Sequence, residues 1–178
     1  DSINRDQHEN NRQDPSAGDA VARTQDISGD ADSCFFCTTP LADSPTGGTR
    51  PMSIKKADDT GALWFLSAAD SHKNAEIAAD PAVRLYMQSS KHSGFLVLHG
   101  TATISRDRDR IDDLWNPIVK TWFTEGKDDP RITVIKVTPT DGYYWDNKHG
   151  DFVAATKMMI GAAVGKTLDD SVEGAIAP

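Results

Sequence analysis

Residues 50–73 contain three short groups of side chains whose types could together hold a flat, phosphorylated ligand. Residues 50–52 read Arg-Pro-Met, residues 63–67 read Leu-Trp-Phe-Leu-Ser, and residues 71–73 read Ser-His-Lys. The first group supplies a guanidinium, which can grip a phosphate through two parallel hydrogen bonds. The second supplies aromatic surface, and the third supplies a hydroxyl and an ammonium. The stretch therefore predicts a small-molecule binding site.

Ser71 and Lys73 fall where the first turn of a helix is expected. Ser71 is in the position of an N-cap, and a helix N-terminus carries unpaired N–H groups and a partial positive charge. A lysine in that turn opposes the charge unless an anion such as phosphate is bound. The alternative for Ser71 and Lys73 is an ordinary serine cap followed by a solvated lysine. The alternative for Arg50 is an exposed arginine on a strand. Pro51 has no N–H for a strand ladder, so it favours an edge strand or a backbone that faces a ligand.

Aromatic residues accompany these positions. Trp64, Phe65 and Trp145 could line a cleft for a heteroaromatic ring, although packing in the core is the alternative for each ring alone. Packing in the core or in a dimer interface is expected for three more rings, Trp115, Trp122 and Phe123.

Catalytic and metal motifs are not evident. His149 and Asp151 are too isolated to define an acid–base site, and no catalytic residue is assigned. The sequence has no nucleophile elbow, no Walker loop and no dinucleotide glycine fingerprint. Cys34 and Cys37 lie three apart on a predicted strand and so face opposite sides, which favours two separate thiols over a disulfide or zinc site.

Charge and hydropathy limit the partners. The chain has 178 residues and a formal net charge of −8. This charge argues against nucleic acid as a partner, because phosphate backbones require a basic surface. No apolar run approaches the roughly 20 residues that a membrane-spanning helix needs. We therefore expect one soluble domain, and free thiols suit a cytoplasmic location.

The spacing of apolar and turn residues predicts a mainly β protein. Strands are expected over residues 33–39, 49–57, 63–68, 83–88, 95–104, 132–138 and 142–146. Short sequential strands with a few inserted helices favour a closed or partly closed antiparallel β-barrel with α-helices around it.

Three helices are expected among these strands. One covers residues 71–79 and stops at Asp80-Pro81. A second begins near Asp107 and keeps helical spacing as far as Trp122, with Pro117 as a break or kink. A third covers residues 152–164.

The expected domain covers residues 31–165. Residues 1–30 are polar and predict a tail or a weak helix over 17–25, and residues 166–178 predict a second tail.

The order of these segments resembles the pyridoxamine 5'-phosphate oxidase-like flavoproteins, and within them the general stress protein branch. The segments that carry the resemblance lie between residues 33 and 146 and are Arg50-Pro51-Met52, Trp64-Phe65-Leu66-Ser67, Ser71-x-Lys73, Asp80-Pro81-x-Val83, Gly100-Thr101-Ala102, Leu114-Trp115-x-Pro117, Trp122-Phe123-x-x-Gly126-x-Asp128-x-Pro130 and Tyr144-Trp145-Asp146. The resemblance implies a six-stranded antiparallel split barrel of the FMN-binding type with peripheral helices. It also implies a homodimer with FMN at the subunit interface, and FAD is an alternative flavin.

The resemblance implies roles for residues within residues 50–73 and for one residue outside them. Arg50 and Lys73, helped by Ser71, would hold the FMN phosphate. The other implied contacts to the flavin or its surroundings come from Pro51, Met52, Lys55, Phe65, Leu66, Ser67, His72 and, from the partner subunit, Trp145.

Departures from the family oxidases bear on the activity. Those oxidases carry an arginine where this chain has His72, a glutamine where it has Phe95, and an Arg-rich loop where it has residues 147–150. The Tyr, Arg and Ser cluster that holds their substrate is also missing, so pyridoxamine phosphate oxidase activity is not expected. A flavin-dependent oxidoreductase is one hypothesis. The others are a non-catalytic flavin-binding sensor or carrier, and a protein of the same fold that uses haem or a deazaflavin.

Overall fold

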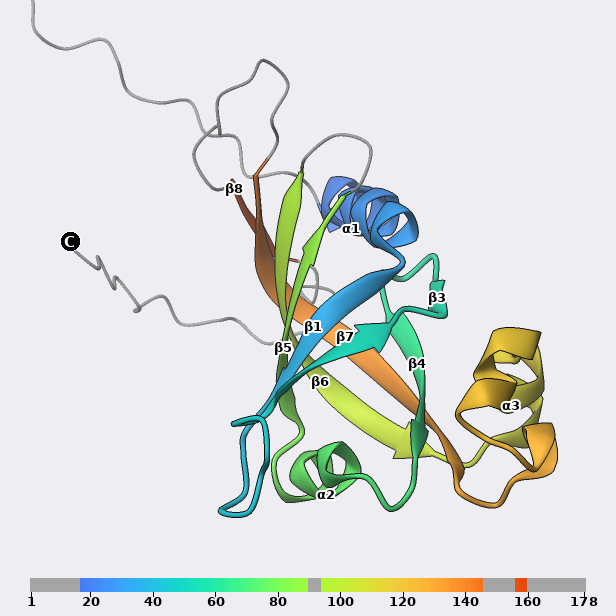
Figure 1. Cartoon of the computed structure of the whole chain (residues 1–178). Coiled ribbons are helices and arrows are strands. Elements are labelled where there is room, and N and C mark those ends of the chain that lie inside the picture. Colours follow the sequence, from blue (N-terminus) through green and yellow to red (C-terminus); the bar gives the residue numbers. More distant parts are fainter. Residues whose placement is uncertain (1–16, 90–93, 146–155, 160–178) are drawn as a thin grey trace, which may run out of the picture.

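The protein is built around one curled antiparallel sheet, seen in a computed structural model that describes residues 17–89, 94–145 and 156–159 (Figure 1). The strands within these residues are β1 (Ser33–Thr38), β2 (Thr49–Ser53), β3 (Lys56–Ala57), β4 (Leu63–Ala68), β5 (Ala82–Gln88), β6 (Phe95–Ser105), β7 (Ile132–Trp145) and β8 (Thr156–Met159). The helices are α1 (Ala17–Ala31), α2 (His72–Ala79) and α3 (Arg108–Leu114), followed by the 3₁₀ helices η1 (Pro117–Thr121) and η2 (Gly126–Asp128). The mainly β split barrel predicted from the sequence is confirmed, with eight strands among the described residues in place of six.

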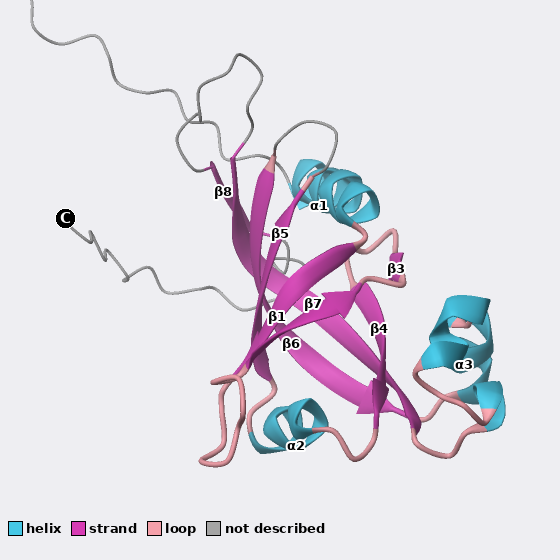
Figure 2. Ribbon diagram, in the orientation of Figure 1, coloured by secondary structure: helices cyan, strands magenta, loops and turns pink. Residues whose placement is uncertain are grey.

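The strand order leaves the barrel open along one line. The path runs β2-β1-β5-β6-β7-β4-β3, and β8 pairs with β7. Thus β2 is an edge strand, as its proline indicates, and the short β3 reaches only Leu63 and Trp64 of β4. We call the line between β2 and the rest of β4 the seam. Helix α2 closes the end of the barrel next to the seam, and α1 lies across the opposite end (Figures 1 and 2).

Strand alternation sorts the side chains into two apolar layers. Inside the barrel, Phe36 and Phe65 are fully buried and meet edge to face, with ring centroids 5.2 Å apart. Outside, α3 and the 3₁₀ segment cover β4 and β7 through a second cluster of side chains: Trp64, Leu66, Ile111, Leu114, Val119, Phe123, Ile132 and Val134. Because apolar side chains are buried on both faces of β4, the position of the end of β4 is fixed. Helix α2 begins shortly after that end.

Several expected elements differ from the structure, and the expected strand 49–57 is divided into β2 and β3. The expected strands 132–138 and 142–146 form one strand, β7, because Thr140 is the extra residue of a bulge opposite His99 and Gly100. Pro139 is tolerated there since a bulge interrupts the ladder. The helix that was expected as far as Trp122 is broken before Pro117, where a break or kink was expected. Helix α3 ends at Leu114, since Asn116 before Pro117 is extended and caps η1 instead.

The two ends of the described chain also differ from expectation. Helix α1 extends to Ala31, beyond the weak helix expected over 17–25, and it buries Ala20, Thr24 and Ile27 against the sheet. The helix expected over 152–164 is wrong for residues 156–159, which form β8. The other residues of that segment lie outside the described ranges, as do His149 and Asp151.

Candidate functional site

The two sides of the seam are connected at both ends, by a backbone hydrogen bond at one end and by side chains at the other. Between the two ends the strands are not paired. At one end, the Lys55 N–H donates to the Trp64 carbonyl over 2.9 Å. At the other end, Arg50 on β2 and Lys73 on α2 approach each other beside Ser67, the next-to-last residue of β4. Among the described residues, β2 pairs only with β1, and the 65–68 part of β4 pairs only with β7. Backbone groups along both edges are therefore free of strand partners within the described chain.

Lys73 lies at the α2 end of the seam, and it is nearly fully buried, with 9 % of its surface exposed. Its ammonium donates hydrogen bonds to the hydroxyls of Ser67 and Ser71. Asn74 accepts hydrogen bonds from both of these hydroxyls and donates to Thr133 Oγ1 over 2.9 Å, so the hydroxyls are held in place. No carboxylate bonds to Lys73 within the described residues. A buried ammonium held only by neutral oxygens is suited to receive an anion.

The environment of Lys73 lowers its pKa from 10.5 to about 8. Burial is the main cause, because it disfavours the charged form. The positive charge of Arg50 lowers the pKa further, and the negative charge of Glu76 raises it in part. A phosphate placed next to this ammonium would reverse the balance, because an opposite charge favours the protonated form.

Arg50 is fixed by an ion pair that the sequence did not predict. Its Nη2 lies 2.7 Å from Glu76 Oε2 on α2, and its Nη1 donates to Thr38 Oγ1 over 2.8 Å. Glu76 is fully buried and also accepts a hydrogen bond from Ser44 over 2.8 Å. A glutamate in a helix is usually solvated, and Glu76 carried no signal of burial except its position three residues after Lys73, on the same face of α2.

The helix start agrees with the prediction. Ser71 is the N-cap of α2, and its side chain accepts a hydrogen bond from the Asn74 N–H. The helix ends at Ala79 with Asp80 as C-cap, immediately before Pro81. His72 is the first residue of the helix, and its side chain is exposed. It makes no hydrogen bond or ion pair with a described residue of the seam. The structure therefore brings together Arg50, Ser67, Ser71 and Lys73, and leaves His72 at the surface.

The remaining predicted residues of β2 and β4 line the seam mainly through their backbone. Phe65 is fully buried inside the barrel, and Leu66 packs on the outside under α3. Met52 points into the barrel, where it packs against the core, and Pro51 points outward and is exposed. Lys55 is half-buried, and burial lowers its pKa.

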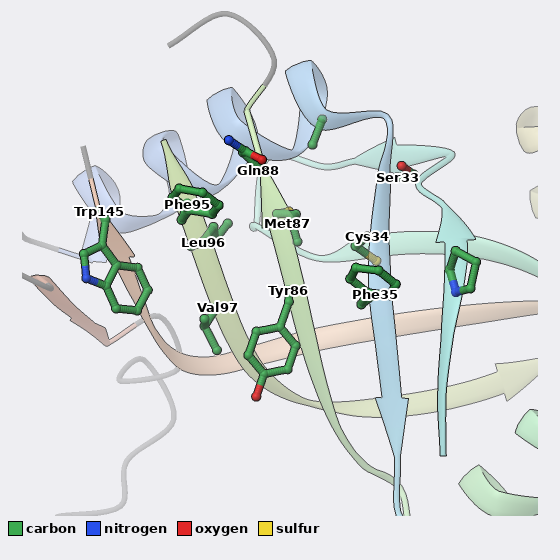
Figure 3. Close-up of a pocket in the computed structure, with 12 residues that line it drawn as sticks. Ser33, Cys34, Phe35, Tyr86, Met87, Gln88, Phe95, Leu96, Val97 and Trp145 are labelled. Carbon is green, nitrogen blue, oxygen red and sulfur yellow. The ribbon is translucent and has the colours of Figure 1, made fainter. Parts of the chain in front are cut away.

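Trp145 lies away from the seam, at the end of β7 on the outer face of the sheet. An open cavity of about 830 Å³ on this face is lined largely by apolar residues (Figure 3). Phe35, Tyr86, Val97 and Trp145 line it, and Pro51 forms its border on β2. Among the residues that the structure describes, Pro51 is thus the only predicted site residue that this cavity shares with the seam.

The described part of the chain also bears on the expectations about cysteines, metal ligands and membrane-spanning helices. Cys34 and Cys37 are free, and burial inside the barrel raises the pKa of Cys34 to about 12. The described residues contain no group of three or more His, Cys, Asp or Glu side chains placed to hold a metal. None of the described helices has the length and apolar content needed to cross a bilayer.

Comparison with known proteins gives the family. The family model described as pyridoxamine 5'-phosphate oxidase like matches residues 19–169. The chain belongs to this family. The resemblance seen in residues 33–146 is thereby confirmed, and the match extends beyond them at both ends.

Relatives of this family member include fungal and bacterial proteins. Protein bli-3 of Neurospora crassa is 28 % identical over 133 residues, which cover 68 % of this chain and 64 % of that protein. General stress protein 26 of Bacillus subtilis is 27 % identical over 82 residues, which cover 44 % of this chain and 58 % of that protein. Both matches span less than two thirds of the relative's own length.

Solved structures share the fold. The general stress FMN/FAD binding protein of Xanthomonas citri superposes with a TM-score of 0.61 at 23 % identity, over 75 % of this chain and 92 % of that one. At this identity the likeness shows the shared architecture, and the site must be argued from the residues present here.

Proposed function

We propose that this protein binds FMN in the seam, with the phosphate at the α2 end. The observation that carries the proposal is Lys73, a buried ammonium whose described partners are only the hydroxyls of Ser67 and Ser71. Arg50 supplies a second positive charge next to it. The site therefore has the charge and the donors that a phosphate monoester requires, and the N-terminus of α2 adds its partial positive charge.

The two strand edges suit the rest of the flavin. A ribityl chain and an isoalloxazine ring carry both donors and acceptors, and the edges of β2 and β4 offer backbone groups that have no strand partner in the described chain. Residues 50–55 and 65–67 would contact the flavin mostly through backbone. Bound FMN would supply one- or two-electron redox chemistry, while the protein supplies position, charge and exclusion of water.

The outer face of the sheet supports the proposal of a homodimer. Directly opposed residues on neighbouring strands form one row across this face: Pro51, Phe35, Tyr86, Val97 and Tyr143. Phe35 is 58 % exposed and Tyr86 is 38 % exposed. A contiguous apolar row of this kind is typical of an interaction surface. A second copy on this face would bury it and would bring Trp145 of each subunit towards its partner, as the family resemblance implies.

The proposed activity is a flavin-dependent oxidoreductase of the general stress protein type. Two proteins of this fold are described as FMN- or FAD-binding, which supports the choice of cofactor. The missing substrate cluster argues against oxidation of pyridoxamine phosphate. A flavin carrier or sensor would use the same seam without turnover, and the experiment below separates these two functions.

The test starts from flavin-free protein. We expect FMN to bind with quenching of its fluorescence, and riboflavin to bind more weakly because it lacks the phosphate. A titration with FAD compares the second flavin. Failure to bind FMN, or equal affinity for FMN and riboflavin, would refute the proposed site, and uptake of haem or a deazaflavin instead would replace the cofactor. Reduction of the bound flavin by NADH or NADPH, followed by turnover with an acceptor, distinguishes an oxidoreductase from a carrier.

A further inference from the structure

Glu76 is a buried carboxylate at the α2 end of the seam. Its Oε2 accepts hydrogen bonds from Arg50 Nη2 and from the Thr38 hydroxyl, and its Oε1 accepts one from Ser44. Burial alone would raise the pKa of Glu76, but the hydrogen bonds from Thr38, Ser44 and Arg50 hold it below its usual value. Glu76 is therefore ionised at neutral pH, and it lies close to a site that we expect to bind an anion.

A negative charge beside a phosphate site requires an explanation, because on its own it would weaken phosphate binding. Its contacts provide one. Arg50 Nη1 is held by Thr38 Oγ1 and Nη2 by Glu76, so the terminal end of the guanidinium is occupied. No described residue accepts a hydrogen bond from Arg50 Nε. The side edge of the guanidinium, formed by Nε and one N–H of Nη2, therefore remains for another ligand.

The same carboxylate joins three segments of the chain. Ser44 bonds to Glu76 and accepts a hydrogen bond from the Gly48 N–H over 3.2 Å. The Thr38 hydroxyl donates to Glu76, and the Thr38 N–H donates to the Gly48 carbonyl over 2.8 Å. Glu76 thus ties α2 to the end of β1 and to the 43–48 loop, which leads directly into β2 and Arg50.

We propose that Glu76 is a positioning residue for the phosphate site: with Thr38 it holds the terminal end of the Arg50 guanidinium, so that the side edge faces the phosphate of bound FMN. The inference rests on the proposed function, because it requires a phosphate at this place. It assigns to a negatively charged residue a favourable effect on the binding of a negatively charged ligand.

The sign of one change tests this inference. The quantity measured is the ratio of the riboflavin Kd to the FMN Kd, since only FMN carries the phosphate. For Glu76→Gln we expect this ratio to fall about tenfold, which corresponds to about 1.4 kcal/mol. A residue that acted only as a negative charge would give a higher ratio on removal, and a residue that only supported the fold would weaken both flavins alike and leave the ratio unchanged. Either result overturns the inference.

Two further variants complete the experiment. Thr38→Val removes the second partner of the guanidinium, so it should lower the ratio in the same direction, and it carries the test if Glu76→Gln does not fold. Asp59→Asn removes one negative charge from an exposed turn and should leave the ratio as in the wild type. If wild-type protein shows no preference for FMN over riboflavin, the proposed function fails, and this inference fails with it. If the wild type prefers FMN and the ratio is unchanged in Glu76→Gln, or in Thr38→Val where Glu76→Gln does not fold, only this inference fails.

Discussion

Replacing Lys73 by methionine should make the flavin-free protein more stable while it weakens FMN binding. The buried ammonium has a pKa of about 8 in the folded protein, against 10.5 for a lysine in water. At about 1.4 kcal/mol for each pKa unit, the fall from 10.5 to 8 corresponds to roughly 3 kcal/mol of stability that is lost by keeping Lys73 protonated. Methionine has a similar length, carries no charge and avoids this cost, and Ser67 and Ser71 retain Asn74 as a partner.

The pH dependence gives this prediction a sign. Between pH 8 and 10.5 the unfolded chain binds a proton at residue 73 that the folded protein does not. The contribution of Lys73 to the free energy of unfolding of the wild type therefore rises with pH. The advantage of Lys73→Met, up to about 3 kcal/mol, should therefore be full below pH 8 and disappear above about pH 10.5. At pH 7, FMN should bind roughly 10- to 100-fold more weakly, the usual effect of losing a hydrogen bond to a charged group, whereas riboflavin affinity should hold.

Urea unfolding of flavin-free protein at pH 7 and pH 10, together with flavin titrations, measures these quantities. Lys120→Met is the matched control, because Lys120 is exposed on η1 and its loss should change neither stability nor affinity. The reasoning is refuted if Lys73→Met is less stable than the wild type at pH 7, or if its advantage is the same at both pH values. Unchanged FMN affinity would remove Lys73 from the phosphate site.

Four other outcomes are expected. The FMN affinity of the wild type should fall as pH rises above about 8, because Lys73 must then take up a proton to bind phosphate, and a titration with riboflavin should show no such fall. If the proposed homodimer forms through the outer face, Phe35→Asp should convert it to a monomer in sedimentation analysis, and a dimer that survives this change would exclude the outer face as the interface. Phe36→Ala should lower the free energy of unfolding by about 3–5 kcal/mol, because a fully buried ring leaves a cavity. Trp122→Ala should change it by less than about 0.5 kcal/mol, since Trp122 is 76 % exposed, and a larger loss would show that Trp122 has a partner.

The parts of the fold that could be predicted are those governed by local chemistry. Ser71 and Asp80-Pro81 set the ends of α2, and alternating apolar residues set β5 and β6. The expectations for the strands around Pro139 and for residues 156–159 failed because long-range strand pairing overrides local preference there. Pro139 reads as the end of a strand, yet the bulge opposite Gly100 accommodates it. A glycine is required at residue 100, because a Cβ there would lie only 2.7 Å from the Thr138 carbonyl oxygen.

The candidate site was predictable in its cations but not in their partners. Arg50, Ser71 and Lys73 carry recognisable chemistry in sequence, and the fold brings them to one end of the seam. Glu76 was missed because its role depends on Thr38 and Ser44, which reach it from another part of the chain. Local spacing cannot show that a helical glutamate is buried, since that depends on which elements cover the helix.

The open seam has a consequence for the protein before it acquires a ligand. Two strand edges that face each other without pairing are a template onto which another extended chain can add, and such additions lead to aggregation. Pro51 removes one backbone donor from the β2 edge, and the charged Lys55 and Lys56 lie just beyond the end of β2. These are features that protect edge strands from such pairing. Residues 50–56 would thus serve two needs at once: they leave the seam free for a small molecule and deny it to a neighbouring polypeptide.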